Sequence, residues 1–378
     1  MAGTWRRLAG RLGRGGMCVL TLALAAAACG QTGPLLSPPQ RPGAGPGGAA
    51  SAPATAPAAA ARLQLVWPTP HPGWKENQPP AQWLQHAGSG DPATGGFGGV
   101  RSGGAKFHEG IDIKPLARDK RGVPLDDVFA AMAGTVRHVS RAAGNSGYGR
   151  YVIVEHTGLA PAVYTLYAHL AKIAPEVRVG ATVTAGQVLG TMGHSSGGYM
   201  IPPERSHLHF EIGLAVTSNF EAWYARRRLG GRNEHGMWNG LNLLGVDPIA
   251  FFNAWRAGQV AEPVDFFRKL PAAVRVRVAT LRTPDFVTRY PALLTKPKPF
   301  GVIGGWEISF TWSGLPFAWT PLTPAEVAGL APEKPVLVDV DAALEKRERS
   351  KTLAVQRGGK WTAGKDLELV LQQLFGTP

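Results

Sequence analysis

The segment Ser206–Ile212, which reads Ser-His-Leu-His-Phe-Glu-Ile, constrains the fold more than any other stretch of the chain. Successive side chains of a strand alternate between its two faces, so His207, His209 and Glu211 share one face and three apolar residues share the other. The apolar face can seal a core. On the polar face, the two imidazoles are either ligands of a transition metal or surface histidines of an edge strand.

The composition indicates an exported chain of two or three domains. Its 378 residues are 44% hydrophobic, enough to bury a sizeable core, and its net charge is +14. Residues 1–29 have a basic start and an apolar run from Met17 to Ala28, too short to cross a bilayer, which is typical of a secretory signal. Removing the four arginines of this segment leaves 14 − 4 = +10, so the mature chain stays basic.

The end of this signal, Leu24–Cys29, resembles a bacterial lipoprotein signal, in which the cysteine is lipidated and becomes the first residue. Ordinary signal cleavage is the alternative. We therefore expect a protein of the cell envelope, lipid-anchored through Cys29 and facing the periplasm. In a diderm host, Gly30 after the cysteine favours the outer membrane.

The position of the cysteines limits the chemistry of the mature chain. Cys18 lies inside the signal, so no internal disulfide and no thiolate metal site are expected, and a metal ion must be bound by His, Asp or Glu.

Residues 30–62 are rich in Pro, Ala and Gly and have almost no bulky apolar side chains. Such a segment cannot offset its ordering entropy, so we expect a tether.

The segment after the tether contains a second group of metal-ligand residue types, His108 and Asp112. In a regular strand these positions would lie about 13 Å apart, whereas two ligands of one zinc ion need bonds of only about 2.0–2.2 Å each. A common metal therefore requires a bend, and Gly110 supplies the conformational freedom for it. Without a metal, the two residues would be a loop histidine and an ordinary turn acid.

Short apolar runs separated by glycine-containing turns predict an antiparallel β domain. A first strand is expected at 63–70, ending at prolines, and a tight hairpin at 179–193. Other expected strands lie at 128–139, 151–156 and 163–170.

Five motifs occur in an order that resembles the lysostaphin-type, or LytM-type, zinc endopeptidases. They are His108-Glu-Gly-Ile-Asp112, Gly147-Tyr-Gly149, Tyr167-Ala-His169-Leu170, Gly186-Gln-Val-Leu-Gly190 and His207-Leu-His209-Phe-Glu211. The resemblance covers about residues 63–215 and implies a mainly β catalytic domain, with antiparallel sheets arranged as in the duplicated-hybrid-motif peptidase fold.

The resemblance also implies the site. One zinc ion per chain would be bound by His108, Asp112 and His209, with a position left open for water. His169 and His207 would position or deprotonate that water and stabilise the oxyanion, with the general base unassigned between them. Glu211 is expected to support this site from behind. The remaining histidines are expected to be structural or exposed: His71, His86, His138, His156, His194 and His235.

The implied reaction is hydrolysis of peptide bonds in peptidoglycan stems or cross-links. A basic chain suits such a carboxylate-rich substrate, and no motif indicates nucleic acid. The alternative is a non-catalytic LytM-type regulator that activates cell-wall amidases, although such relatives lack ligands. A biotinyl or lipoyl carrier hairpin at 180–193 is a third hypothesis, but the turn has no lysine to modify. The oligomeric state is not predicted.

The C-terminal third lies outside the resemblance. Helices expected at 219–228 and 247–258 would complete a peptidase domain of residues 63–260. Residues 261–378 should form a small α+β domain of unknown role. Its expected elements are strands at 274–278, 306–312 and 336–340, a capped helix start at 323–326 and a helix at 367–374.

Overall fold

The protein is described by a computed structural model that covers residues 63–376, except 230 and 348–349. The predicted signal, lipidation site and tether lie outside the described residues and remain predictions. No helix in the described part of the chain is both long enough and apolar enough to span a membrane.

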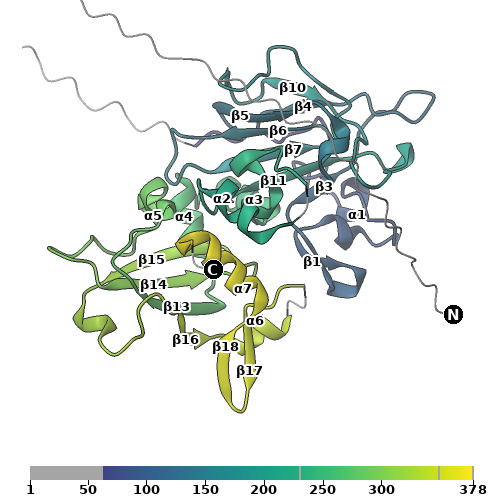
Figure 1. Ribbon diagram of the computed structural model, residues 1–378. Coiled ribbons are helices and arrows are strands. Elements are labelled where there is room, and N and C mark those ends of the chain that lie inside the picture. The colour runs from purple at the N-terminus through teal and green to yellow at the C-terminus, as the bar shows by residue number, and fades with distance from the viewer. Residues whose placement is uncertain (1–62, 230, 348–349, 377–378) are drawn as a thin grey trace, which may run out of the picture. The chain divides into compact units, whose positions relative to one another are not determined.

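A seven-stranded sheet forms the framework of the first part of the chain (Figure 1), and all of its strand pairs are antiparallel. Strand β3 pairs with β11 beside the path β12-β11-β7-β6-β5-β9. The strands are β3 (Ile111–Ile113), β5 (Gly134–Ser140), β6 (Tyr151–Glu155), β7 (Tyr164–Ala168), β9 (Thr182–Val183), β11 (Leu208–Ala215) and β12 (Leu243–Val246). The prediction of a mainly antiparallel β domain is therefore confirmed.

Two smaller sheets flank this framework. A three-stranded sheet has the order β4-β10-β8, and a two-stranded hairpin joins β1 to β2. Their strands are β1 (Gly98–Arg101), β2 (Lys106–His108), β4 (Asp127–Phe129), β8 (Lys172–Ile173) and β10 (Val188–Thr191). All eight residues of β11 are buried, because both faces of this strand are covered. The apolar face predicted for it is confirmed: Leu208, Phe210 and Ile212 are fully buried in the main core.

Three predictions about these sheets are wrong. The strand predicted at 128–139 is two strands, because β4 ends at Phe129 in the three-stranded sheet and β5 begins at Gly134 in the seven-stranded sheet. Residues 63–70 form no strand; Val66 and Pro68 make single backbone hydrogen bonds to Ala131 and Phe129, and prolines cannot donate to a ladder. The predicted hairpin at 179–193 is also wrong, because β9 pairs with β5 in one sheet and β10 pairs with β4 and β8 in another. The segment therefore connects two sheets.

Short helices lie at the ends of strands and beside the sheets. They are α1 (Pro80–Trp83), α2 (Phe220–Arg227), α3 (Pro248–Arg256), α4 (Pro263–Phe267), α5 (Asp285–Arg289), α6 (Ala342–Arg347) and α7 (Lys365–Phe375). The helices predicted at 219–228 and 247–258 are present as α2 and α3. Helix α3 begins as predicted, because the Asp247 carboxylate accepts from the Ile249 and Ala250 amides and Pro248 occupies the first turn.

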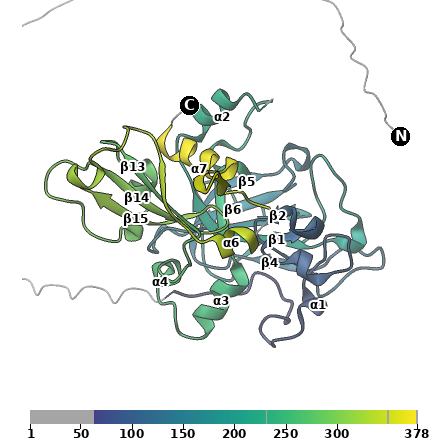
Figure 2. The same ribbon diagram turned by 90° about the horizontal axis from the view of Figure 1, so that it is seen from below.

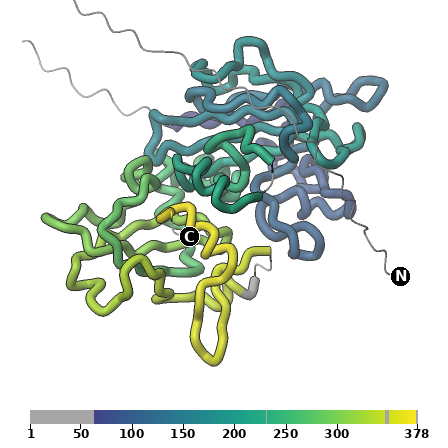
Figure 3. Tube along the Cα trace, in the orientation of Figure 1, coloured from purple at the N-terminus to yellow at the C-terminus, as the bar shows by residue number. Residues whose placement is uncertain are grey.

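The C-terminal segment contains a four-stranded antiparallel sheet of order β15-β14-β13-β16, with α7 against it and a separate β17–β18 hairpin (Figure 1). Figure 2 shows β13, β14 and β15 side by side from below, and Figure 3 traces the segment in green to yellow. The strands are β13 (Val274–Ala279), β14 (Gly305–Phe310), β15 (Pro316–Leu322), β16 (Val336–Val340), β17 (Ala354–Arg357) and β18 (Lys360–Ala363).

Most elements predicted for this segment are present, with two corrections. The helix start predicted at 323–326 is only a 3-10 turn, Ala325–Val327. The strand predicted at 306–312 ends at Phe310, so Trp312 lies in the turn before β15. The domain boundary at residue 260 remains a prediction, since Phe252 and Phe267 on either side of it belong to one continuous core.

Candidate metal centre

Three strands bring the predicted ligands together. His108 ends β2, Asp112 lies in β3, and His209 lies in β11 directly opposite Asp112 in the antiparallel register. The chain bends at residues 109–110, as predicted. The reason for Gly110 is different from the predicted one: a Cβ there would lie 2.2 Å from the carbonyl oxygen of Phe210. Glycine is needed for the close approach of β11.

The donor atoms of these three residues form a nearly equilateral triangle. His108 Nε2 lies 3.1 Å from Asp112 Oδ1 and 3.0 Å from His209 Nδ1, and the latter two atoms are 3.0 Å apart. Donors on a tetrahedral zinc ion, with bonds of about 2.0 Å, lie about 3.3 Å apart. The triangle therefore fits one face of a zinc coordination tetrahedron, and the three residues are a group that could hold a metal ion.

Hydrogen bonds behind the triangle orient both imidazoles. Nδ1–H of His108 donates to the Gly96 carbonyl oxygen over 2.6 Å, and Nε2–H of His209 donates to Glu211 Oε1 over 2.9 Å. Neither oxygen is a donor, so the nitrogen of each ring that points into the triangle is left with its lone pair available. Two lone pairs and a carboxylate oxygen converge at one point, an arrangement that a cation stabilises.

Glu211 is fully buried and accepts two further hydrogen bonds, from Tyr148 Oη over 2.6 Å and Tyr164 Oη over 2.8 Å. The supporting position expected for this residue is confirmed, since it contacts His209 and not the triangle itself. The two tyrosines fix the carboxylate that in turn fixes the His209 ring.

The electrostatics of the site favour positive charge at the triangle. Burial opposes ionisation of Asp112, but His108, His207 and Arg101 together hold the pKa of its carboxyl well below the usual range. Burial also opposes the protonation of His209, yet its hydrogen bonds to Asp112 and Glu211 raise its pKa to about 9. The same carboxylates that favour a proton on His209 would favour a metal ion in its place.

The two predicted catalytic histidines lie beside the triangle. His207 Nε2 is 3.6 Å from Asp112 Oδ2, and the ring centroids of His169 and His207 are 4.8 Å apart. Nδ1–H of His169 donates to the Ser195 carbonyl oxygen and Nδ1–H of His207 to that of Arg205, over 2.8 and 2.7 Å. Burial lowers the pKa of both rings, that of His169 well below the usual range. Each therefore has a neutral Nε2 available to accept a proton.

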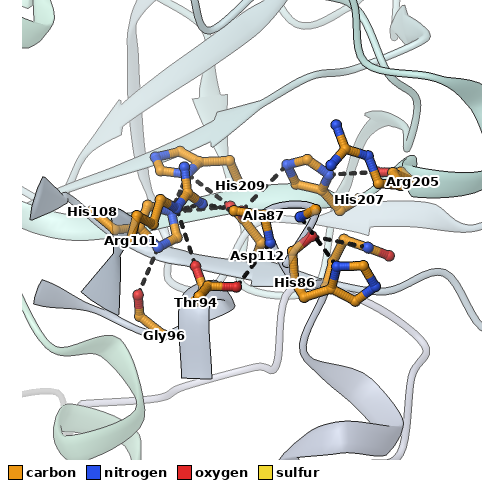
Figure 4. A network of polar contacts seen from close by, with 12 residues as sticks. His86, Ala87, Thr94, Gly96, Arg101, His108, Asp112, Arg205, His207 and His209 are labelled. Carbon is orange, nitrogen blue, oxygen red and sulfur yellow. Dashed lines mark hydrogen bonds and ion pairs between the residues drawn. The ribbon is translucent and has the colours of Figure 1, made fainter. Parts of the chain in front are cut away.

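Asp112, His169 and His207 line a cavity of about 410 Å³ that opens the site to substrate. Its walls carry three cationic side chains, Arg101, Lys106 and Arg205, and no acid other than Asp112 among the described residues. In Figure 4, Arg101 and His108 lie on one side of Asp112, and Arg205 and His207 lie on the other.

Sequence reasoning missed Arg101. Its guanidinium Nη2 contacts Asp112 Oδ2 and lies 2.9 Å from His108 Nε2, while its Nε donates to the Thr94 carbonyl oxygen over 3.0 Å. A single arginine seven residues before His108 has no periodic signal. The pairing of β1 with β2 places it beside the ligands.

The histidines given no catalytic role behave mostly as expected. His156 is fully buried between the Ala133 carbonyl and the Thr165 hydroxyl, and His194 Nδ1 donates within its own loop to Ile201. His138 and His235 contact one another, with ring nitrogens 3.2 Å apart. His86 is the exception, since it lines the cavity beside the candidate site.

Comparison with known proteins places this site within a family. Residues 106–219 match Peptidase family M23, a span that includes all five candidate site residues. No curated protein matches the chain. This segment is therefore a peptidase-family domain, and the match confirms the resemblance to LytM-type enzymes.

Solved structures with a similar segment include a zinc-containing peptidase from Vibrio cholerae (28% identity, 28% of this chain and 26% of that chain, TM-score 0.21). Another is a putative glycyl-glycine endopeptidase lytM from Ruminococcus gnavus (28% identity, 28% and 39%, TM-score 0.23). A third is the catalytic domain of the antimicrobial peptidase lysostaphin from Staphylococcus simulans (22% identity, 39% and 80%, TM-score 0.25). The chain thus matches well under half the length of the first two.

Proposed function

We propose that the protein is a zinc-dependent endopeptidase with one zinc ion held by His108, Asp112 and His209. The observation that carries this proposal is the 3.0–3.1 Å triangle of donor atoms, with both histidine tautomers fixed so that lone pairs point inward. Zinc in such a site supplies a Lewis acid that acidifies water and polarises a carbonyl group.

His169 and His207 would handle protons at the scissile peptide bond. Each presents a neutral Nε2 toward the cavity, because its Nδ1–H is held by a backbone carbonyl. One ring would accept the proton of the attacking water at its Nε2. The other would donate a hydrogen bond to the developing oxyanion in its protonated form, in which Nε2 carries a hydrogen. Their centroid separation of 4.8 Å allows both rings to reach one reacting carbon.

The proposed substrate is the peptide part of peptidoglycan, in stems or cross-links. The family assignment of residues 106–219 supports this class. The basic walls of the cavity support it as well, since Arg205 and Lys106 have no acidic partner among the described residues. Stem peptides carry free carboxylates that such side chains would attract.

A complete set of donors and proton carriers supports catalysis over the alternative role as a non-catalytic activator of cell-wall amidases. The two functions predict different results from one experiment. Isolated peptidoglycan is incubated with the purified chain and with the His207→Ala variant, and the released muropeptides are identified by mass spectrometry. An endopeptidase releases fragments cut within peptides, and the variant does not.

Two controls make the result decisive. Chelator treatment should abolish release, and added zinc should restore it. A wild-type chain that carries zinc but cleaves no peptidoglycan of any cross-link type would refute the enzymatic function. In that case, phenotype rescue by the His207→Ala chain in a deletion strain would favour the regulator.

We also propose that the chain is exported and lipid-anchored at Cys29, in the cell envelope facing the periplasm. The basic, apolar and small-residue order of residues 1–29 supports this location. Metabolic labelling with a radioactive fatty acid tests it. Label should appear in the wild-type chain and be lost in Cys29→Ser, and an unlabelled wild-type chain would refute the anchor.

A further inference from the structure

The turn between β14 and β15, in the C-terminal segment of unknown role, is held rigidly by its own hydrogen bonds. The Thr311 amide donates to the Leu315 carbonyl over 3.0 Å, and the Gly314 amide donates to the Thr311 carbonyl over 2.9 Å. The Thr311 and Ser313 hydroxyls lie 2.8 Å apart. Trp312 therefore projects from a fixed turn.

The Trp312 ring contacts the peptidase-family part of the chain. Its centroid lies 5.7 Å from the ring centroids of both Phe97 and Phe107, and those two rings are 5.4 Å from one another. These are favourable separations for aromatic pairs. Lys351, from the same C-terminal segment, places its Nζ 4.9 Å from the Phe107 centroid. Two parts of the C-terminal segment thus contact one hairpin.

Gly98 makes room for this contact. A Cβ at Gly98 would lie 2.7 Å from the Trp312 ring, and its φ of +107° is one that other residues rarely adopt. The close approach of the tryptophan therefore depends on the glycine that opens β1.

The hairpin held by Trp312 carries two residues of the candidate site. Phe107 immediately precedes His108 in β2, and Phe97 immediately follows Gly96, whose carbonyl fixes the His108 ring. Arg101 ends β1. The strand position of His108 and the orientation of its imidazole therefore both depend on residues adjacent to the aromatic cluster.

A second contact attaches the C-terminal segment independently of Trp312. Arg289 Nη2 donates to the Ala215 carbonyl over 2.9 Å, and the Ala215 amide donates to Tyr290 Oη over 3.2 Å. Asp285 accepts from the Ser218 amide over 2.7 Å. These bonds hold the far end of β11, so loss of the Trp312 ring leaves the segment attached.

We infer that the C-terminal segment positions the metal centre, with Trp312 as the positioning residue that holds the β1–β2 hairpin so that His108 and Arg101 face Asp112. The inference rests on the proposed metal centre. It gives residues 261–376 a role in the site, although none of the predicted ligands or proton carriers lies among them.

The test compares Trp312→Ala and Trp312→Phe with Trp361→Ala in the full chain. Trp361, on β18 of the same segment, is also partly buried. Zinc affinity is measured by competition with a chromophoric chelator, and amide hydrogen exchange is measured across residues 97–108 in the metal-free chains. Trp312→Ala should weaken zinc binding about tenfold or more and speed this exchange. Trp312→Phe should keep most of the affinity, and Trp361→Ala should change neither.

Unchanged zinc affinity and unchanged exchange in a folded Trp312→Ala chain would overturn the inference, and so would equal losses in Trp361→Ala. If Trp312→Ala does not fold, Trp312→Leu is measured with the same criteria. A wild-type chain that binds no zinc would refute the proposed function. The rate of amide hydrogen exchange across residues 97–108 would still show whether Trp312 stabilises the β1–β2 hairpin.

Discussion

Nε2 of His108 and Nδ1 of His209 face one another across 3.0 Å, although the other nitrogen of each ring already donates to an oxygen acceptor. Two lone pairs at this distance repel unless a proton or a metal ion lies with them. The two histidines are 101 residues apart in the sequence, and the fold brings them together at a point that attracts a cation.

Glu211→Gln tests how far this geometry depends on the residue behind His209. The variant keeps the size of the side chain but weakens its hold on Nε2–H, since an amide offers one acceptor oxygen to three donors. We expect zinc affinity to fall about 10–100-fold, measured by chelator competition. Tyr164→Phe, which removes one of the three donors, should have a smaller effect. Equal zinc affinity in Glu211→Gln and wild type would contradict this role.

His169→Ala and His207→Ala should separate catalysis from metal binding. Neither residue belongs to the donor triangle, so each variant should bind one zinc ion with an affinity within about threefold of wild type. Peptidoglycan cleavage should fall by about 10²-fold or more, the contribution typical of a proton carrier. Zinc content is measured by atomic absorption and cleavage by released muropeptides. If a variant lost bound zinc together with activity, the substituted histidine would be a metal ligand, and its assignment as a proton carrier would be wrong.

Gly110→Ala tests the close approach between β3 and β11. The added Cβ would lie 2.2 Å from the Phe210 carbonyl oxygen, so the strands must separate where Asp112 and His209 pair. We expect a loss of about 1–3 kcal/mol or more in the free energy of unfolding. Gly158→Ala, whose Cβ would meet no atom within 4 Å, is the matched control. The free energy of unfolding of both variants is measured by urea unfolding. Equal stability of Gly110→Ala and Gly158→Ala would contradict the close packing of Gly110 against Phe210.

Buried histidines outside the site predict how stability depends on pH. Burial lowers the pKa of His156 to about 4, against 6.5 when unfolded. Between these values the unfolded chain binds a proton that the folded chain does not, so stability falls as the pH drops from about 6.5 to about 4. His156 alone contributes up to about 3 kcal/mol to this fall. Urea unfolding across this range should show a shallower pH dependence in His156→Gln, and an unchanged dependence would contradict the assignment.

The sequence predicted those parts of the structure that depend on local pattern. The alternation in Leu208–Ile212 gave the faces of β11, and Asp247-Pro248 gave the start of α3. The five candidate site residues were predicted from the order of the motifs, and the pairing of β11 with β3 and β7 brings them together. For these residues, the family resemblance added assignments that spacing alone left open.

Other parts depended on tertiary packing that has no local signal. The apolar residues of 63–70 resemble a strand, but Val66 and Pro68 make only one backbone hydrogen bond each to residues 129–131, and Pro68 has no amide hydrogen with which to complete a ladder. Val183 and Val188 suggested a hairpin, yet their strands joined different sheets. Arg101 contacts Asp112, and Trp312 contacts Phe97, only once the β1–β2 hairpin has folded, so neither residue could be recognised before the fold was known.

Zinc titration of the metal-free chain tests the central claim most directly. Peptidoglycan cleavage is followed as zinc is added to the apo wild type and to apo Asp112→Ala, with Asp119→Ala, an exposed turn acid, as the matched control. Cleavage should be absent without metal, rise to a break at one zinc ion per chain in wild type and Asp119→Ala, and stay absent in Asp112→Ala. Full cleavage by the metal-free chain, or by zinc-treated Asp112→Ala, would contradict the proposed metal centre.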